Sequence, residues 1–209
     1  AKICEPALVE VQDAPEVPNG WRWFNFGSVT GELRNGISTK PEQKPPGHPI
    51  LRISSVRPGA VLFEDRRYLP ESDHLLDTYR LRDGDLLFTR YNGSLDLLGV
   101  CGLVRGLGSH ILLYPDKLMR VRFDHPFIVP GYAELYFQSS FARDRMTEKS
   151  KSSAGQQGIS GADVKAQPIA IPPIKEQGEI VRRIEVLFKL ADKIEKRVEA
   201  ATKRADKLT

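Results

Sequence analysis

The sequence has few cysteines and no long hydrophobic run. Its two cysteines, Cys4 and Cys101, lie far apart and match no metal-binding spacing, so we expect reduced thiols in a cytoplasmic protein. No stretch of about 18 apolar residues is present, which argues against a membrane span. The opening residues do not have the basic-then-apolar pattern of a secretory leader. These absences predict a cytoplasmic location and no contact with a membrane.

The motifs of common enzymes are also missing. There is no G-x-x-x-x-G-K-[ST] phosphate loop, no H-E-x-x-H zinc motif and no G-x-S-x-G nucleophile elbow. The Asn/Asp-Pro-Pro-aromatic motif of amino-group methyltransferases is absent, as is the acidic residue with a following Glu-x-Lys pair of metal-dependent nucleases. The scattered histidines are expected on surfaces or strands rather than around a metal: His48, His74, His110 and His125. We predict no catalytic residue, no metal site and no cofactor.

Length and charge leave the class of protein open. With 209 residues, 40% of them hydrophobic and 28% charged, the chain suits one sizeable domain or a domain with an appendage. The net charge of +4 argues only weakly for nucleic acid. Arginine outnumbers lysine by 14 to 7 before residue 174. Because a guanidinium suits guanine edges and phosphates as well as structural ion pairs, this excess supports both interpretations.

Turn signals divide the chain into three parts. Residues 1–20 are expected to form an irregular opening segment, residues 21–173 a globular domain and residues 174–209 a long helix. The fold class is α+β, with many short strands and a few helices in the domain. Proline and glycine predict a surface loop at 34–49, and glycine and serine predict a flexible loop at 152–161. Strands are expected at 50–56, 86–90, 99–104, 110–114, 118–123 and, as an edge strand, 164–173, and a helix at 130–145.

The last segment has a regular apolar stripe. Its spacings alternate between 4 and 3 without interruption, and an average period of 3.5 is typical of a coiled-coil seam. At 1.5 Å per residue a helix over 174–209 is about 54 Å long. The alternative is a surface helix folded back on its own domain. The alanines of the stripe indicate close approach of a second helix. The seam consists of Ile180, Ile184, Leu187, Ala191, Ile194, Val198, Ala201, Ala205 and Leu208.

The stretch ISGADVKAQPIAIPPIKEQGEIVRRIEVLF at 159–188 resembles the DNA-specificity subunits of type I restriction-modification enzymes. In that family a strand with an Ile-x-x-x-x-Leu/Val-Lys pattern is followed by an apolar-Pro-Pro/Leu step and Glu-Gln-x-x-Ile-Val. Upstream, the run Pro18-Asn19-Gly20-Trp21 and the segments at 49–61 and 83–104 are also similar to the family. The matching residues of the first stretch are Ile159, Val164, Lys165, Ile171, Pro172, Pro173, Glu176, Gln177, Ile180 and Val181.

The resemblance implies a non-catalytic subunit that reads one half of a split target in double-stranded DNA. The globular domain would then be a target recognition domain and the helix a spacer. Its partners would be a methyltransferase subunit, an ATP-dependent restriction subunit, and a second recognition domain and helix supplied in cis or by a homodimer. Family members carry two domains and two helices and this chain has one of each, so it is expected to be either a half-length subunit or a fragment. The alternative function is a coiled-coil scaffold that binds no DNA.

Three segments are candidates for DNA contact. Base contacts are expected first at the end of the strand 86–90, where arginine pairs with guanine and asparagine with adenine, and then in the loop 34–48. Alternatively, Arg90 pairs with Asp85 or Asp96. Phosphate contacts are expected in the glycine-rich segment at 149–157. The base-contact candidates are Arg90, Tyr91, Asn92, Arg34, Asn35, Lys40, Gln43 and Lys44, and the phosphate-contact candidates are Lys149, Lys151, Ser152, Ser153, Gln156 and Gln157.

Overall fold

A four-stranded antiparallel sheet lies at the centre of the computed structural model, which describes residues 6–153 and 156–206. Three of its four strands are buried along their whole length, as their mostly apolar sequences predict. The strand order is β2 (Leu33–Asn35), β10 (Leu118–Val121), β7 (Leu86–Thr89) and β9 (Cys101–Leu103).

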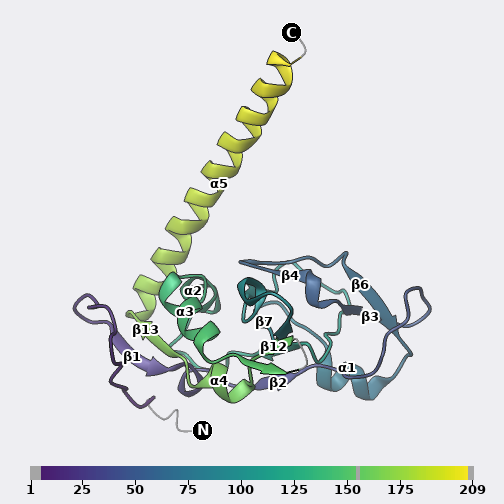
Figure 1. Cartoon of the computed structure of the whole chain (residues 1–209), viewed down its shortest axis with the longest axis horizontal. Helices are drawn as coiled ribbons and strands as arrows, with labels where there is room; N and C mark the ends of the chain where they lie inside the picture. Colours follow the sequence, from purple (N-terminus) through teal and green to yellow (C-terminus); the bar gives the residue numbers. More distant parts are fainter. Residues whose placement is uncertain (1–5, 154–155, 207–209) are drawn as a thin grey trace.

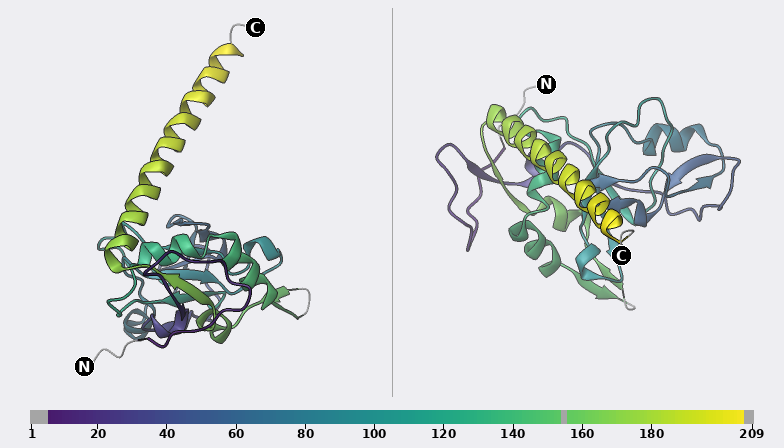
Figure 2. Two further views of the ribbon diagram at one scale, coloured as in Figure 1. Left: turned by 90° about the vertical axis from the view of Figure 1, so that its left-hand side faces the viewer. Right: turned by 90° about the horizontal axis from the view of Figure 1, so that it is seen from above.

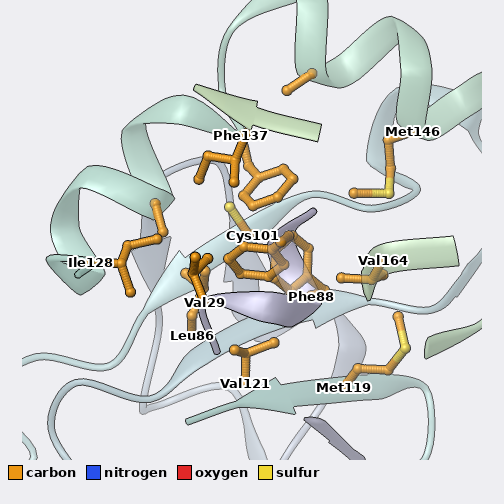
Figure 3. Close-up of a cluster of buried hydrophobic side chains, with 14 of the residues drawn as sticks. Val29, Leu86, Phe88, Cys101, Met119, Val121, Ile128, Phe137, Met146 and Val164 are labelled. Atoms are coloured by element: carbon orange, nitrogen blue, oxygen red, sulfur yellow. The ribbon is translucent and has the colours of Figure 1, made fainter. Parts of the chain in front are cut away.

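Different clusters of apolar side chains cover the two faces of this sheet. Successive side chains of a strand point to opposite faces, so Leu86 and Phe88 enter one cluster while Leu87 enters another. In the first cluster the rings of Phe88 and Phe137 meet edge to face with their centroids 5.1 Å apart, beside Cys101 (Figure 3). Three helices add side chains to this cluster: α2 (Pro130–Tyr136), α3 (Ser140–Glu148) and α4 (Gly161–Lys165).

A second group of short elements lies on the side of the sheet away from α2 and α3 (Figure 1). The predicted strand at 50–56 is interrupted here, because residues 53–55 form a 3-10 turn in which the Ser55 hydroxyl accepts a 2.9 Å hydrogen bond from the backbone N–H of Arg52. The predicted strand at 110–114 is reduced to an isolated bridge between Leu113 and Ile50. The group comprises β3 (His48–Leu51), η2 (Ile53–Ser55), β4 (Val56–Arg57), β5 (Ala60–Val61), β6 (Arg66–Leu69) and α1 (Asp73–Tyr79).

The flexible loop predicted at 152–161 is wrong for the residues that are described. They form a three-stranded ribbon, because strand β8 supplies hydrogen-bonding partners that the local composition does not reveal. Its order is β11 (Lys151–Ser153), β12 (Gln156–Gly158) and β8 (Tyr91–Asn92), and the 3-10 helix η3 (Leu95–Leu97) follows β8.

Two predicted elements differ from those observed because a helix begins at a capping residue that the prediction did not include. The helix expected at 130–145 is two helices, because the side chain of Ser139 accepts a hydrogen bond from the N–H of Ala142 and starts α3 anew. Part of the strand expected at 164–173 is α4, which begins with a capping box between Ser160 and Asp163. The same helix replaces the strand that the family resemblance implies at the Val164-Lys165 step.

The chain enters the domain and leaves it at one place. Strand β1 (Arg22–Asn25) pairs antiparallel with β13 (Pro168–Ile171), so that Arg22 lies opposite Ile171. The 3-10 helix η1 (Phe26–Ser28) follows β1. After Pro172 and Pro173 the chain continues as α5 (Ile174–Ala205), which rises from the domain as a straight rod (Figures 1 and 2). Its 32 residues correspond to about 48 Å.

Candidate nucleic-acid interface

Four of the eight predicted base-contact residues lie at one end of the central sheet: Asn35, Arg90, Tyr91 and Asn92. Strands β2 and β7 both run antiparallel to β10, so they end beside its start. The backbone N–H of Arg90 donates to the carbonyl of Lys117 at 2.8 Å, and the N–H of Gly36 donates to that of Leu118 at 3.1 Å. Asn35 and Lys117 are exposed at this end. The sequence interpretation had missed Lys117, although it follows the turn residues Pro115 and Asp116.

The ribbon brings a second predicted segment to the same place. Gln157 lies opposite Asn92 and Gly158 opposite Tyr91, and the N–H of Ile159 donates to the carbonyl of Arg90 at 3.0 Å. Two segments that are 65 positions apart in sequence therefore form a single surface. We call the following residues the candidate interface: Asn35, Arg90, Tyr91, Asn92, Lys117 and Gln157.

The remaining phosphate-contact candidates are only partly placed. Lys149 is exposed at the C-terminal end of α3, just before the ribbon. Backbone pairing puts Lys151, Ser152 and Ser153 on β11 and Gln156 on β12. Their side chains lie outside the described part of the structure, so their contacts stay predictions.

Arg90 differs from the arginines that stabilise the fold. Its guanidinium carbon lies 4.7 Å from the centroid of the Tyr91 ring, and its Nε has no hydrogen-bond acceptor among the described residues. The alternative pairing with Asp85 is not found, because Asp85 is held by Arg122 through bonds of 2.7 and 2.9 Å. Pairing with Asp96 is also absent from the described ion pairs. The guanidinium of Arg90 thus has a buried Nε without a partner among the described residues, and no carboxylate of those residues pairs with it.

Asn92 and Arg34 are more constrained. The side-chain oxygen of Asn92 accepts a 3.0 Å hydrogen bond from the N–H of Ser94, as in an Asx turn, so its amide NH₂ remains for other contacts. Arg34 donates to Glu32 at 2.6 Å, and this hydrogen bond raises the pKa of the arginine. Since Glu32 also pairs with the buried Arg120, Arg34 is part of a structural network. We assign Arg34 to that network.

The other candidate residues of the loop at 34–48 lie in a different region of the domain, beside β6. The backbones of Glu42 and Tyr68 exchange two hydrogen bonds of 2.8 and 2.9 Å, which fasten the loop to β6. Strand β6 lies at the side of the domain opposite α5's base, apart from β12 (Figure 1). Lys40, Gln43 and Lys44 therefore line a hollow with Arg67 of β6, apart from the candidate interface.

Five of the 14 arginines before residue 174 take part in ion pairs among the described residues: Arg34, Arg52, Arg105, Arg120 and Arg122. Arg120 is fully buried in β10, where it pairs with Glu32 and donates to the carbonyl of Thr78 at 3.2 Å. Arg105 reaches the buried carboxylate of Glu134 at 2.5 Å. Such pairs are expected where charges are removed from water. These pairs account for part of the arginine content without nucleic acid.

The seam of α5 has two different parts. Ile180 and Ile184 are half-buried: Ile180 packs on the main apolar cluster, and Ile184 lines a groove of about 340 Å³ between α2 and α5. The side chains of Leu187, Ile194 and Val198 are 61%, 53% and 59% exposed. The seam alanines Ala191 and Ala201 are exposed as well. The side chain of Ala205 and residue Leu208 lie outside the description. The predicted coiled-coil face therefore begins where α5 leaves its own domain (Figure 2).

The base of α5 is fixed to the domain by polar contacts. The side chain of Gln177 is fully buried, accepts from the N–H of Val129 at 2.8 Å and donates to the carbonyls of Phe127 and Pro172 at 2.8 and 3.0 Å. Beside it, the indole N–H of Trp21 donates to Glu176 at 3.0 Å. Because the buried amide of Gln177 makes all of these hydrogen bonds, it fixes the direction of α5 relative to the domain.

Neither a metal centre nor a membrane span is found in the described chain. Among residues 6–153 and 156–206, no three or more His, Cys, Asp or Glu side chains are grouped so that they could hold a metal ion. No helix in the same residues combines the length and apolar character needed to cross a membrane. Burial raises the pKa of the Cys101 thiol, which keeps it protonated inside the apolar cluster.

Comparison with known proteins connects these features. The type I restriction modification DNA specificity domain matches residues 129–204, which include α2, α3, strands β11 and β12 and nearly all of α5. The EcoKI specificity subunit of Escherichia coli K12 is 54% identical over 186 residues, or 89% of this chain and 40% of that protein. The chain belongs to the family of type I restriction-modification DNA specificity subunits. The family resemblance predicted from the sequence is thus confirmed.

Other members of the specificity family are more distant. The StySPI specificity subunit of Salmonella potsdam is 30% identical over 91% of this chain and 41% of its own length. The crystal structure of the HsdS subunit from Thermoanaerobacter tengcongensis superposes with a TM-score of 0.65 at 21% identity, covering 94% of this chain and 49% of that one. This likeness confirms the predicted α+β fold with its long helix. The chain spans about two fifths of the curated relatives' length.

The motifs of the specificity family meet at the base of α5. Trp21 belongs to the Pro-Asn-Gly-Trp run, and Glu176 and Gln177 belong to the Glu-Gln pair that follows the two prolines. In the structure these motifs contact each other and the loop at 127–129. The most specific part of the resemblance therefore corresponds to the joint between domain and helix, whereas the DNA contacts stay predictions.

Proposed function

We propose that this chain is a non-catalytic specificity subunit that reads one half of a split target in double-stranded DNA. The candidate interface contacts the bases, and α5 sets the distance to a second recognition domain, supplied in cis or by a second copy. The subunit thereby positions a methyltransferase subunit and a restriction subunit on the DNA. It acts in the cytoplasm and holds no cofactor of its own.

One structural observation supports this proposal above the others. The globular domain is joined to a long helix through a fully buried glutamine, and the helix then carries exposed apolar residues. A flexible joint would let the domain rotate freely, and the separation of two half-sites would vary. With a fixed joint, a helix of about 48 Å can hold two domains more than one DNA turn of about 34 Å apart.

The polar groups of the candidate interface suit duplex DNA. Lys117 supplies a cation to phosphate, while Arg90 and the amides of Asn92 and Gln157 present donors that can reach base edges. In other DNA-binding proteins, β-strands enter the major groove and contact base edges. The arrangement thus combines sequence-independent attraction with groups able to discriminate bases.

The proposal is tested by sequencing the methylated sites in a cell that carries the intact system. A split target with one constant spacing is the expected result. Methylation that is independent of the interface, when Arg90, Asn92 and Gln157 are all replaced by alanine, would contradict the proposal. A coiled-coil scaffold, the second candidate, would pair through α5 in vitro and show neither salt-sensitive duplex binding nor a sequence preference.

A further inference from the structure

The ring of Tyr91 occupies space that is open only because residue 158 is glycine. A Cβ at position 158 would lie 2.6 Å from Cε1 and 2.7 Å from Cδ1 of Tyr91. This contact follows from the register, since Tyr91 and Gly158 are directly opposite each other in β8 and β12. Any larger residue at 158 has to displace the ring.

The displaced ring would in turn release Arg90. The guanidinium carbon of Arg90 lies 4.7 Å from the centroid of the Tyr91 ring, within the range of a cation–π contact. No carboxylate of the described residues holds this guanidinium, in contrast to Arg105 and Arg122. The ring is therefore a described group that restricts the orientation of the Arg90 fork, whose Nε is buried.

A restricted, unpaired guanidinium is suited to a ligand with two acceptors at fixed spacing. In the major groove, guanine presents N7 and O6 side by side, and a bidentate arginine is the commonest specific contact to them. Restriction before binding reduces the conformational entropy that an arginine side chain loses on contact. Neighbouring Asn92 adds amide donors, because its oxygen is already bound to Ser94.

We propose that Tyr91 and Gly158 are positioning residues that orient the Arg90 guanidinium for one guanine of the target half-site. This inference rests on the proposed function and adds to it a base, a reading residue and the two residues that hold it. Tyr91, which the sequence suggested as a base contact, acts here through Arg90. Gly158 acts by leaving space for the ring.

The test uses the intact specificity subunit in complex with its methyltransferase partner. A pool of random-sequence duplexes is methylated, and the modified molecules are sequenced for the wild type and for Tyr91→Ala, Tyr91→Phe, Gly158→Ala and Arg90→Lys. Tyr91→Phe keeps the ring and should keep the preference. Tyr91→Ala, Gly158→Ala and Arg90→Lys should each lower the preference for guanine at one position by roughly ten- to a hundredfold. Preferences at the other positions should not change.

The possible failures are distinguishable. A wild type that enriches no sequence at all would overturn the proposed function itself. A wild type with a clear target, and a Tyr91→Ala variant that keeps its full guanine preference, would overturn only the positioning role. Arg90→Lys keeps the charge and the ribbon, so an unchanged guanine preference in this variant overturns the assignment, and with it the positioning role, even if the Tyr91 or Gly158 variants fail to fold. Uniform loss of preference at all positions by Arg90→Lys would also refute the assignment to one guanine.

Discussion

The indole N–H of Trp21 donates a hydrogen bond of 3.0 Å to the carboxylate of Glu176, 155 positions later in the chain. The contact lies where β1 and β13 run side by side and where α5 begins. Beside it, Gly131 of α2 faces Val181 of α5, and a Cβ on the glycine would lie only 3.3 Å from that valine. A polar contact and a close packing contact thus hold the same joint.

Replacement of Gln177 by alanine should loosen this joint. The substitution leaves the N–H of Val129 and the carbonyls of Phe127 and Pro172 without their partner, and we expect a loss of about 3 kcal/mol in the free energy of unfolding. Urea unfolding measures the loss, and amide hydrogen exchange at Val129 should become faster. The exposed Gln43, changed to alanine, serves as the control and should alter neither quantity. Unchanged exchange at Val129 in the Gln177 variant would show that the joint does not depend on this amide.

The exposed seam of α5 should tolerate charge in the isolated domain but not in a pair of helices. Ile194→Lys and Val198→Lys each place a cation on a face that is more than half exposed, so the melting temperature of the domain should not change. Pairing through α5 should weaken by at least about tenfold per substitution, because each side chain loses the burial of its apolar surface. Sedimentation equilibrium over a range of concentrations measures the association. Lys196→Ala, on the opposite face, is the matched control, and equal effects of all three variants would argue against the seam.

Lys117 should contribute to affinity without contributing to sequence preference. Lys117→Ala removes an exposed cation from the candidate interface, and a lost phosphate contact should weaken binding to all duplexes and reduce the salt dependence by about one unit of slope. Titration of a random-sequence duplex at several salt concentrations measures both effects. Lys203→Ala, near the far end of α5, removes the same charge at a distance from the interface and should leave the slope as it is. A slope unaffected by Lys117→Ala would remove this residue from the interface.

A fall in pH should remove the stabilisation that comes from the ion pairs of Glu32 with Arg34 and Arg120. Burial raises the pKa of this carboxyl, but hydrogen bonds and charge from Arg34 and Arg120 outweigh burial and hold the pKa below its ordinary value of 4.5. A carboxyl with a lowered pKa in the folded state stabilises the fold fully above its unfolded pKa and loses this contribution as the pH falls through the folded one. Glu32→Gln should therefore flatten the fall in unfolding free energy below pH 4.5. Urea unfolding at a series of pH values tests this, with exposed Glu64→Gln as the control; identical slopes for wild type and Glu32→Gln would contradict it.

Sequence alone predicted the elements whose periodicity is long or whose strands are buried. The uninterrupted stripe after Pro173 predicted α5, and the apolar runs at 86–90 and 118–123 predicted the central strands. The ribbon was missed because β12 depends on β8, 65 positions away, and glycine and serine alone suggest a loop. Two helix starts were overlooked although Ser139 and the Ser160–Asp163 capping box carry a recognisable signal.

The site was predicted less completely than the fold. Arg90 and Gln157 were both candidates, but their meeting in one surface depends on long-range strand pairing. Arg34 was selected for its charge, and its use in an ion pair follows from Glu32 and the buried Arg120, which no local pattern reveals. Lys117 was overlooked because it stands in a short turn whose position beside Arg90 is decided by the order of the sheet.

The pairing of β1 with β13 has a consequence for how such proteins change. Since the polypeptide enters and exits its domain through adjacent strands, the segment from Asn25 to Pro168 is closed by the pairing of β1 with β13. Exchanging this segment for one of a different shape, with the flanking strands and the contacts of residues 127–131 to α5 retained, leaves the joint and the length of α5 unchanged. The bases that such a domain reads and the distance between the two half-sites can therefore change independently in evolution.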